Sequence, residues 1–334
     1  NEVFFIKKVL ILFGGNSSEH YISCKSCVSV LKNIDRKRYD IEVAGISKNN
    51  IWYKFSDDLF YLEEGSWKDS NILEIDNIIN YLRKFDVVFP VMHGTNAEDG
   101  RMQGFLDLFD IKYVGCKTLS SALLMDKAIT KLILKSLDIP SVPFKVIKDN
   151  YEICDLIENI KFPMIVKPSN GGSSIGISKV NNKKELIKAI KLAKKYDDKL
   201  LVEKFINARE LEVAVLKDNK NIICSNPGEI KSANEFYDYD AKYDNKDSYT
   251  LIPNDLPEDI LKKIKEYSLR LFKSLDCSGL SRIDFFYDEE NNALYLNEAN
   301  TMPGFTTISM YPKLIESIGI EYKDLISILI DNSL

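Results

Sequence analysis

The chain has 334 residues, of which 45% are hydrophobic and 28% charged, and its formal net charge is −5 at pH 7. This length favours two or three compact domains over a single core. The composition is typical of a soluble globular protein, and the acidic balance argues against a nucleic-acid or anionic-membrane partner.

Neither a membrane span nor an export signal is apparent in the sequence. No apolar run is long enough to cross a bilayer. The apolar N-terminal segment is interrupted by Lys7 and Lys8 and ends at Gly14-Gly15, which favours a buried strand over a signal peptide. Cys24 and Cys27 form a CxxC without a second pair or a nearby histidine, so we expect reduced thiols rather than a zinc site. These features predict a cytoplasmic protein.

Residues 1–115 alternate short apolar runs with helical patterns. This alternation predicts an α/β domain with a small doubly wound sheet of parallel strands. The expected strands are 7–13, 39–47 and 85–92, and the expected helices are 18–33 and 100–109. In such sheets, ligands bind where strands end and helices begin, so residues 14–19 and 93–100 are candidate site segments.

Two further units of mixed α and β structure are predicted, over residues 116–206 and 207–334. The first combines a helix carrying Met125-Asp126-Lys127 with strands at 142–148, 162–168, 175–180 and 199–206 and a helix at 183–196. The second contains a polar loop at 231–250, a helix at 257–276, a hairpin and a terminal helix. No internal repeat or low-complexity linker separates the units, so we expect them to pack closely.

The segment 281–301 predicts a β-hairpin with a charged face. A turn centred on Asn291 places Asp284 opposite Glu298 and Arg282 opposite Asn300. All four side chains then share one face of the sheet. Two carboxylates and an amide suit Mg²⁺, which takes oxygen ligands from protein, water and phosphate. The alternative is a solvent-facing sheet with a surface ion pair, but the glycine turn that follows the hairpin favours a ligand site.

A glycine-rich turn follows Lys167 and contains Ser173 and Ser174. It is neither a P-loop nor a dinucleotide fingerprint. Its backbone N–H groups and hydroxyls can cradle a phosphate, and the alternative is a flexible hairpin turn.

Two polar residues near the first candidate segments have open roles. Glu19, with Asn16, fits a capping box, or its carboxylate binds a cationic amino group of a substrate. His93 ends an apolar strand, and a single histidine in that position is more often structural than catalytic.

Together, these segments resemble the D-alanine–D-alanine ligase family over nearly the whole chain. The matching motifs, in chain order, are Phe13-Gly14-Gly15 with Ser18-Glu19-His20, His93-Gly94 with Glu98-Asp99-Gly100, Met125-Asp126-Lys127, Lys167-Pro168 with Gly172-Ser173-Ser174-Ile175-Gly176, Pro227-Gly228-Glu229-Ile230, Phe236-Tyr237-Asp238-Tyr239 with Lys242-Tyr243, Arg282-Ile283-Asp284, and Asn297-Glu298-Ala299-Asn300-Thr301-Met302-Pro303-Gly304. Their order and spacing make the combination highly specific.

The resemblance implies an ATP-grasp architecture, in which an N-terminal Rossmann-like domain (1–115) precedes two α+β subdomains (116–206 and 207–334) that clasp ATP. It implies that ATP phosphorylates one D-alanine and that the amine of a second attacks the acylphosphate. The product, D-alanyl-D-alanine, serves peptidoglycan precursor synthesis. The implied cofactors are two Mg²⁺ or Mn²⁺ ions per site, with ATP as co-substrate, and the implied assembly is a cytoplasmic homodimer.

The resemblance also assigns residue roles. The implied ATP-binding residues are Lys127, Lys167, Ser174, Glu203, Lys204, Ile206, Glu210 and Lys242. The implied metal ligands are Asp284, Glu298 and Asn300, which agrees with the hairpin argument. The implied catalytic residues are Glu19, Ser173, Tyr243, Arg282 and Gly304, with Glu19, Ser173 and Tyr243 as a hydrogen-bonded triad and residues 231–250 as a lid. The implied D-alanine contacts are Glu19, His93, Ser309 and Met310.

Some residues depart from the family pattern, and other functions compete. Tyr21 replaces an acidic residue and Asn96 a tyrosine, and we expect both near the first D-alanine. The lid residues Lys242 and Tyr243 argue against a D-lactate acceptor but not against D-serine, so a D-alanine–D-serine ligase is the alternative. The missing GxGxxG disfavours an oxidoreductase. Intact metal residues disfavour a non-catalytic ATP-binding regulator.

Overall fold

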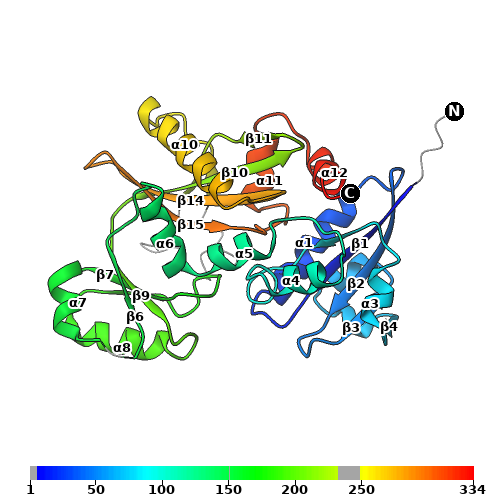
Figure 1. Cartoon of the computed structure of the whole chain (residues 1–334), viewed down its shortest axis with the longest axis horizontal. Coiled ribbons are helices and arrows are strands. Elements are labelled where there is room, and N and C mark those ends of the chain that lie inside the picture. Colours follow the sequence, from blue (N-terminus) through cyan, green and yellow to red (C-terminus); the bar gives the residue numbers. More distant parts are fainter. Residues whose placement is uncertain (1–5, 150, 232–248) are drawn as a thin grey trace.

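The computed structural model describes residues 6–149, 151–231 and 249–334, which form a mixed α/β structure with three sheets of five, four and six strands (Figure 1). No helix among these residues is long and apolar enough to cross a membrane. Residues 232–248, which include most of the predicted lid with Lys242 and Tyr243, lie outside the described residues.

The N-terminal sheet is built around β1 (Lys7–Gly14), which pairs in parallel with β2 (Tyr39–Ile46) and β5 (Val87–Pro90). The apolar residues 9–13 of β1 are completely buried, as expected for a parallel strand covered on both faces. The predicted helices are present as α1 (His20–Asn33) and α4 (Arg101–Leu108). This part of the sequence prediction is confirmed.

The same sheet has an antiparallel extension that the sequence pattern did not predict. Its strand order is β4-β3-β2-β1-β5, and β3 pairs antiparallel with both neighbours. The additional elements are β3 (Trp52–Phe55), α2 (Leu59–Glu63), a short 3₁₀ helix (Trp67–Asp69), β4 (Ile72–Glu74) and α3 (Ile78–Leu82). Each is three to five residues long, which is too short to show a clear hydrophobic period.

The predicted helix around Met125-Asp126-Lys127 is two helices, α5 (Thr118–Met125) and α6 (Lys127–Ser136). Asp126 lies between them in an extended conformation, with φ −85° and ψ 100°. Its carboxylate accepts hydrogen bonds from the backbone N–H groups of Ala128 and Ile129, so it caps α6. The prediction of one continuous helix is therefore wrong, because an N-cap aspartate starts a new helix at this point.

The four-stranded sheet is antiparallel, with the order β6-β9-β7-β8, and has its own hydrophobic core. Its elements are β6 (Phe144–Ile147), α7 (Ile153–Ile160), β7 (Met164–Pro168), β8 (Ser178–Val180), α8 (Lys183–Ala193) and β9 (Leu200–Lys204). All were predicted except α7, and the strands are shorter than predicted. This core draws only on residues between Ile147 and Val202.

The six-stranded sheet is also antiparallel, with the order β13-β12-β10-β14-β15 and β11 paired to β10. Its strands are β10 (Arg209–Asp218), β11 (Asn221–Cys224), β12 (Gly228–Lys231), β13 (Tyr249–Leu251), β14 (Leu280–Asp288) and β15 (Ala293–Asn300). The accompanying helices are α10 (Glu258–Ser274), α11 (Met310–Glu316) and α12 (Tyr322–Asp331). Thus two helices stand where one terminal helix was predicted.

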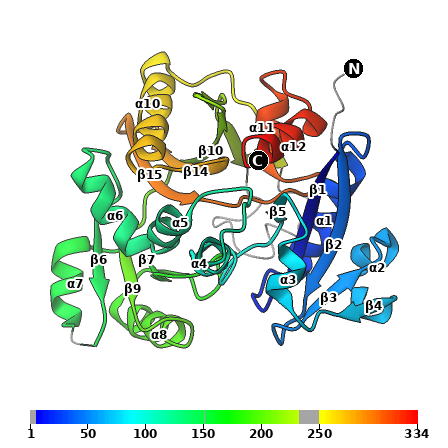
Figure 2. The same cartoon turned by 45° about the vertical axis from the view of Figure 1, so that its right-hand side comes forward.

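Two hydrophobic cores join elements from different parts of the chain, whereas the four-stranded sheet has a core of its own. One core joins β1 and α1 of the N-terminal sheet to α11 and α12 at the C-terminus, and α12 lies beside α1 (Figure 1). A second core joins α5 and α6 to α10, β14 and β15. Figure 2 shows the four-stranded sheet as a separate layer, facing the large sheet with α5 and α6 between them. The division into residues 1–115, 116–206 and 207–334 stays a prediction.

We predict that Asp126→Ala lowers the free energy of unfolding by about 1–2 kcal/mol, because α6 loses its N-terminal cap. Urea unfolding followed by circular dichroism measures the change. Ser136→Ala at the opposite end of α6 is the control, since its exposed hydroxyl bonds only to the Ile133 carbonyl in the described structure. Equal losses in the two variants would contradict the capping role.

Candidate active site

Two adjoining cavities lie where the three sheets meet. The first cavity lies between the N-terminal sheet and the large sheet, and includes Glu19, His93 and Arg282 in its lining. The second cavity lies between the four-stranded and the large sheet, and includes Lys167 and Glu203. The two cavities adjoin because they share several lining residues, namely Lys127, Gly171, Gly172, Ser173, Glu212, Ile230 and Glu298.

The charged hairpin has the predicted pairing between residues 282–284 and 298–300. Arg282 pairs with Asn300, and Asp284 with Glu298. The register then shifts by one residue, and Phe285 pairs with Leu296 rather than with Asn297. A β-bulge therefore lies at residue 297, and the turn spans 289–292 instead of being centred on residue 291.

The bulge decides which face the polar residues of β15 occupy. Before it, the buried residues are Leu294 and Leu296, and after it the buried residue is Ala299. Without the extra residue, Glu298 and Asn300 would continue the series of Leu294 and Leu296 into the core. With it, they face the cavities together with the polar residues of β14.

Arg282 is held between two carboxylates. Its Nε and Nη2 donate to Asp284 Oδ1 and Oδ2, both at 2.8 Å, and its Nε lies 3.1 Å from Glu212 Oε2. Burial alone would lower the pKa of Arg282, but Asp284 and Glu212 raise it well above its ordinary value. Glu212 was missed in the sequence, although the register of β10 places it directly opposite Asp284. The arginine is thus a fixed positive charge in the lining of the first cavity.

The three residues predicted to bind metal lie close together on the hairpin, and their role as ligands stays a prediction. Asn300 Nδ2 donates to Asp284 Oδ2 at 3.1 Å, and Glu298 is the cross-strand partner of Asp284. Among the described residues, no group of three or more His, Cys, Asp or Glu side chains could hold a metal ion. Two carboxylates and one amide fit Mg²⁺ bound together with phosphate, since Mg²⁺ takes few protein ligands and completes its shell with water and phosphate oxygens.

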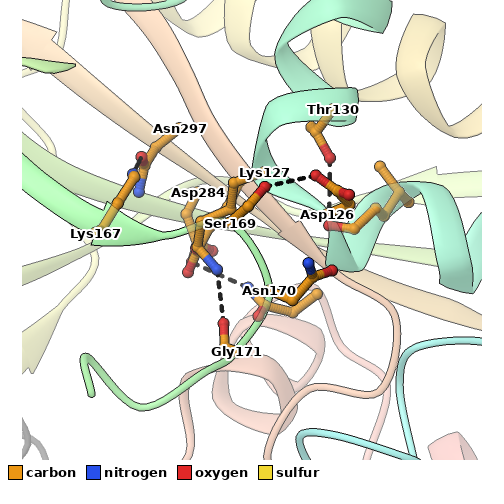
Figure 3. Close-up of polar contacts among 12 residues, drawn as sticks. Asp126, Lys127, Thr130, Lys167, Ser169, Asn170, Gly171, Asp284 and Asn297 are labelled. Carbon is orange, nitrogen blue, oxygen red and sulfur yellow. Dashed lines mark hydrogen bonds and ion pairs between the residues drawn. The ribbon is translucent and has the colours of Figure 1, made fainter. Parts of the chain in front are cut away.

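Lys127 reaches from the start of α6 to both the hairpin and the glycine-rich turn (Figure 3). Its Nζ donates to the Gly171 carbonyl at 2.7 Å and lies 3.6 Å from Glu298 Oε2. In the turn itself, Ser173 and Ser174 adopt left-handed backbone conformations, with φ of 53° and 57°. The turn thus lies against a lysine and lines both cavities, which favours the phosphate-binding interpretation.

Glu19 does not act as a helix cap. It precedes α1, but its side chain makes no capping hydrogen bond. Its buried carboxylate instead accepts a hydrogen bond from Ser173 Oγ at 2.6 Å, across 154 residues of sequence. Of the two roles left open by the sequence, the structure therefore disfavours the capping box. Two members of the predicted triad are in contact, and the third, Tyr243, lies outside the described residues.

His93 is buried and bonded through both ring nitrogens. Nδ1 lies 3.1 Å from the Met302 carbonyl and Nε2 lies 2.8 Å from Ser26 Oγ. Burial lowers the pKa of His93, so the ring is neutral at pH 7, with the proton on Nδ1 facing the carbonyl. His93 lines the first cavity and at the same time ties the N-terminal sheet to the loop after β15.

Glu98 is a second acid in the first cavity, and sequence reasoning gave it no role. Its carboxylate accepts hydrogen bonds from the backbone N–H groups of Gly94 at 3.0 Å and Met302 at 3.2 Å. Burial and the neighbouring Glu19 raise the pKa of Glu98 to about 8. The sequence signal that could have identified Glu98 is its place in the motif pair His93-Gly94 and Glu98-Asp99-Gly100.

A buried cluster of three charges borders the second cavity, which Lys167 and Glu203 line. Lys167 Nζ lies 2.7 Å from Glu203 Oε2, and Lys131 Nζ lies 2.9 Å from Glu203 Oε1. Lys167 Nζ also approaches Asn297 Oδ1 at 3.4 Å, so the bulge residue faces this cavity (Figure 3). Lys131 was not predicted.

The remaining predicted residues of the second cavity are also in its lining: Ser174, Lys204, Ile206 and Glu210. The Lys204 ammonium donates to the Phe162 carbonyl at 3.2 Å.

Gly304, Ser309 and Met310 line the far end of the first cavity. Ser309 Oγ accepts the backbone N–H of Thr306 at 3.0 Å. A Cβ on Gly304 would lie 2.7 Å from Ser309 Oγ, so any side chain at this position would displace the Ser309 hydroxyl.

Two residues expected near this cavity are not among those that line it. Tyr21 is exposed, and its hydroxyl donates to the Glu63 carbonyl at 3.1 Å. Asn96 donates to Asn16 Oδ1 at 2.6 Å and accepts from Arg101 at 3.1 Å. Both side chains are bonded to partners in the N-terminal part of the chain, and their nearness to the first D-alanine stays a prediction.

Comparison with known proteins agrees with this architecture. Two family models match, D-ala D-ala ligase N-terminus over residues 8–116 and D-ala D-ala ligase C-terminus over residues 133–331. D-alanine–D-alanine ligases from Thermoanaerobacter sp. (strain X514) and Clostridium novyi (strain NT) are 45% and 46% identical, over 97% of this chain and 96% and 97% of theirs.

Solved structures of related ligases have a similar fold. The VanG D-Ala:D-Ser ligase from Enterococcus faecalis has a TM-score of 0.89 at 34% identity, covering 99% of this chain and 100% of that chain. The D-alanine-D-alanine ligase from Coxiella burnetii has a TM-score of 0.86 at 32% identity, covering 98% and 93%.

An N-terminal α/β domain followed by two antiparallel sheets, with lysines and carboxylates between them, defines an ATP-grasp fold, as the sequence predicted. The chain belongs to the D-alanine–D-alanine ligase family. Members of this family use ATP.

The raised pKa of Glu98 predicts a pH-dependent stability. In the unfolded chain Glu98 ionises near pH 4.5, but in the folded protein it keeps its proton up to about pH 8. The contribution of Glu98 to stability is therefore fully present below pH 4.5 and is lost as pH rises towards 8, by at most about 1.4 kcal/mol per pH unit. Glu98→Gln should flatten this decline in thermal unfolding measured from pH 5 to 8. An unchanged pH profile would show that Glu98 is already ionised in the folded state.

Proposed function

We propose that the protein joins two D-alanine molecules to D-alanyl-D-alanine, with conversion of ATP to ADP and phosphate, as a step in peptidoglycan precursor synthesis. The observation that carries the proposal is the contact of Glu19 with Ser173, which brings a carboxylate of the N-terminal domain to the glycine-rich turn. In this proposal, Glu19 binds the amino group of the substrate, and the glycine-rich turn next to it binds phosphate.

The second cavity is the proposed ATP site. Lys127 and Lys167 are cations at its inner end and can meet the phosphates, while the backbone of residues 171–174 surrounds them. Residues from Glu203 to Ile206 would line the adenine, and Glu210 would hold the ribose. Lys242, which lies outside the described residues, would reach the transferred phosphate.

Asp284, Glu298 and Asn300 are the proposed ligands of Mg²⁺ or Mn²⁺, with two ions per site. When bound, these ions neutralise charge on the phosphates and thereby favour phosphoryl transfer. The fit rests on the oxygen-rich donor set of the hairpin and on its position between Lys127 and Arg282.

The first D-alanine would bind in the first cavity, with its ammonium group on Glu19. Its carboxylate, turned towards the ATP site, is the atom group that accepts the phosphoryl group. Arg282 and the backbone N–H of Gly304 would then stabilise the oxyanion that forms when the second amine attacks. Such fixed electrostatic stabilisation is usually a large contribution in acyl transfer.

The second D-alanine would place its carboxylate at Ser309 and Met310, next to Gly304. Tyr243 is the proposed third member of the triad with Glu19 and Ser173, and residues 231–250 are the proposed lid. A lid serves the chemistry, because an acylphosphate exposed to water hydrolyses. We further propose a cytoplasmic homodimer, which sedimentation can test.

A D-serine acceptor is the alternative function. It is supported by the likeness to the VanG D-Ala:D-Ser ligase, whereas the curated relatives with higher identity are D-alanine–D-alanine ligases. The first function is therefore favoured.

We predict that ADP and phosphate form only when ATP, Mg²⁺ and D-alanine are all present, and that D-alanyl-D-alanine is the product. A coupled phosphate-release assay with mass spectrometry of the product tests this. Mixed reactions with D-alanine and D-serine identify the preferred acceptor. Equal turnover with L-alanine would refute the proposal, and preferential D-alanyl-D-serine would favour the alternative.

We predict that Asp284→Asn and Glu298→Gln each lower kcat by at least about a hundredfold, because the site loses a carboxylate that organises metal and phosphates. Circular dichroism should show an intact fold. Glu290→Gln in the turn of the same hairpin is the matched control, since Glu290 is exposed. Near-normal turnover of either variant at saturating Mg²⁺ would exclude the metal assignment.

A further inference from the structure

The loop that follows β15, residues 301–306, contains the proposed oxyanion donor. This donor is the backbone N–H of Gly304, and residues 301–304 and 306 line the first cavity. A preorganised donor acts only if it lies where the charge forms. Because a glycine has no side chain that could hold it, the neighbouring residues have to fix its position.

The start of this loop is bonded to the segment that follows β5. The Met302 N–H donates to Glu98 Oε1 at 3.2 Å, and the Met302 carbonyl lies 3.1 Å from His93 Nδ1. In addition, Thr301 Oγ1 donates to the Glu98 carbonyl at 3.4 Å. Both polar groups of the Met302 backbone are therefore fixed from the N-terminal sheet.

The end of the loop is bonded to Ser26 of α1. The Phe305 N–H donates to Ser26 Oγ at 3.3 Å, and the same hydroxyl lies 2.8 Å from His93 Nε2. Ser26 is completely buried and lines neither cavity. It can therefore influence the site only through the groups that it bonds.

The directions of these hydrogen bonds follow from the donors present. His93 carries its proton on Nδ1, towards the Met302 carbonyl, so its Nε2 is an acceptor and the Ser26 hydroxyl donates to it. The Ser26 oxygen then accepts the N–H of Phe305. A chain of bonds through the two side chains thus joins the Met302 carbonyl to the Phe305 N–H. Removing the Ser26 hydroxyl breaks this chain at two bonds.

This arrangement leaves one N–H of the segment 302–305 available. The N–H groups of Met302 and Phe305 are bonded, and Pro303 has none. The Gly304 N–H has no hydrogen-bond partner among the described residues. The bonded residues on either side therefore hold a single unused donor at the first cavity.

We propose that Ser26 is a positioning residue for the Gly304 N–H. It holds the loop on both sides of this donor, through His93 at the start and through the Phe305 N–H at the end. The inference rests on the proposed function, in which the amine of the second D-alanine attacks an acylphosphate. Its effect falls on that attack rather than on ATP binding, because the loop lines the first cavity and not the second.

The test is Ser26→Ala in single-turnover reactions with enzyme in excess over ATP, which exclude a limit set by product release. Dipeptide should form roughly tenfold more slowly, less than the hundredfold or more expected when an oxyanion donor is lost altogether. More than one phosphate should be released per dipeptide, because water has longer to attack the acylphosphate. KM for ATP should stay within about twofold. An unchanged rate with a ratio of one would overturn the proposal.

Two serine variants serve as controls. Ser29 is buried one turn further along α1, and its hydroxyl donates to the Lys25 carbonyl of the same helix at 3.3 Å, so Ser29→Ala should leave rate and ratio unchanged. Ser225→Ala controls for lost stability. Its buried hydroxyl also accepts a backbone N–H, at 3.0 Å, and donates once, at 2.7 Å, but it lines neither cavity. If Ser225→Ala raised the ratio as much as Ser26→Ala, the role of Ser26 would be overturned.

Hydrogen exchange of the backbone tests the hold on the loop without ligation. In Ser26→Ala, the Phe305 N–H should exchange about tenfold faster because it loses its acceptor, whereas Ser29→Ala should not change it. Unchanged exchange in Ser26→Ala would overturn the proposal. If the wild type forms no dipeptide but the exchange changes as expected, the ligase function is refuted and the hold of Ser26 on the loop stands.

Discussion

The site depends on an irregularity in one pair of strands. The extra residue Asn297 in β15 reverses the faces of the strand, so that Leu296 packs in the core while Glu298 and Asn300 face the cavities. The same bulge directs Asn297 towards Lys167. A regular hairpin of this sequence would place two polar side chains in the hydrophobic core, and burial without partners is unfavourable. The bulge therefore positions Glu298 and Asn300, and Glu298 reaches Lys127 as a result.

Polar contacts, rather than a common apolar core, connect the small sheet to the rest of the site. Lys127 spans from α6 to Gly171, and Ser173 meets Glu19 of the N-terminal domain. Buried pairs of this kind contribute little net stability, since desolvation offsets much of their attraction. Their value lies in fixing positions. Charged groups from three separate parts of the chain reach the same place only when all parts are correctly assembled.

Long elements such as β1 and α10 could be predicted from the sequence, because each has a clear apolar pattern. The paired charged residues of the hairpin could also be predicted, because the turn near residue 291 sets which residues lie opposite each other. Short elements such as β3 and α3 could not, because they are packed by distant residues. The break at Asp126 needed recognition of a cap inside an apolar pattern. Lys131, Glu98 and Glu212 were missed, because only the fold shows that Lys131 and Glu212 are buried beside other charges and that Glu98 lines the first cavity. For Glu19, the sequence allowed two roles, and a contact 154 residues away favoured one.

The distribution of the hydrophobic cores has a mechanical consequence. The N-terminal sheet and the C-terminal helices α11 and α12 share one core, so separating them would expose apolar surface, whereas the four-stranded sheet closes its core on itself. The proposed ATP site lies between the small and the large sheet, so a shift of one sheet against the other would open it. Moving the small sheet breaks hydrogen bonds and ion pairs that water can replace, but moving the large one would expose apolar surface. Product release should therefore proceed by a hinge-like tilt of the four-stranded sheet, with the rest of the molecule held still.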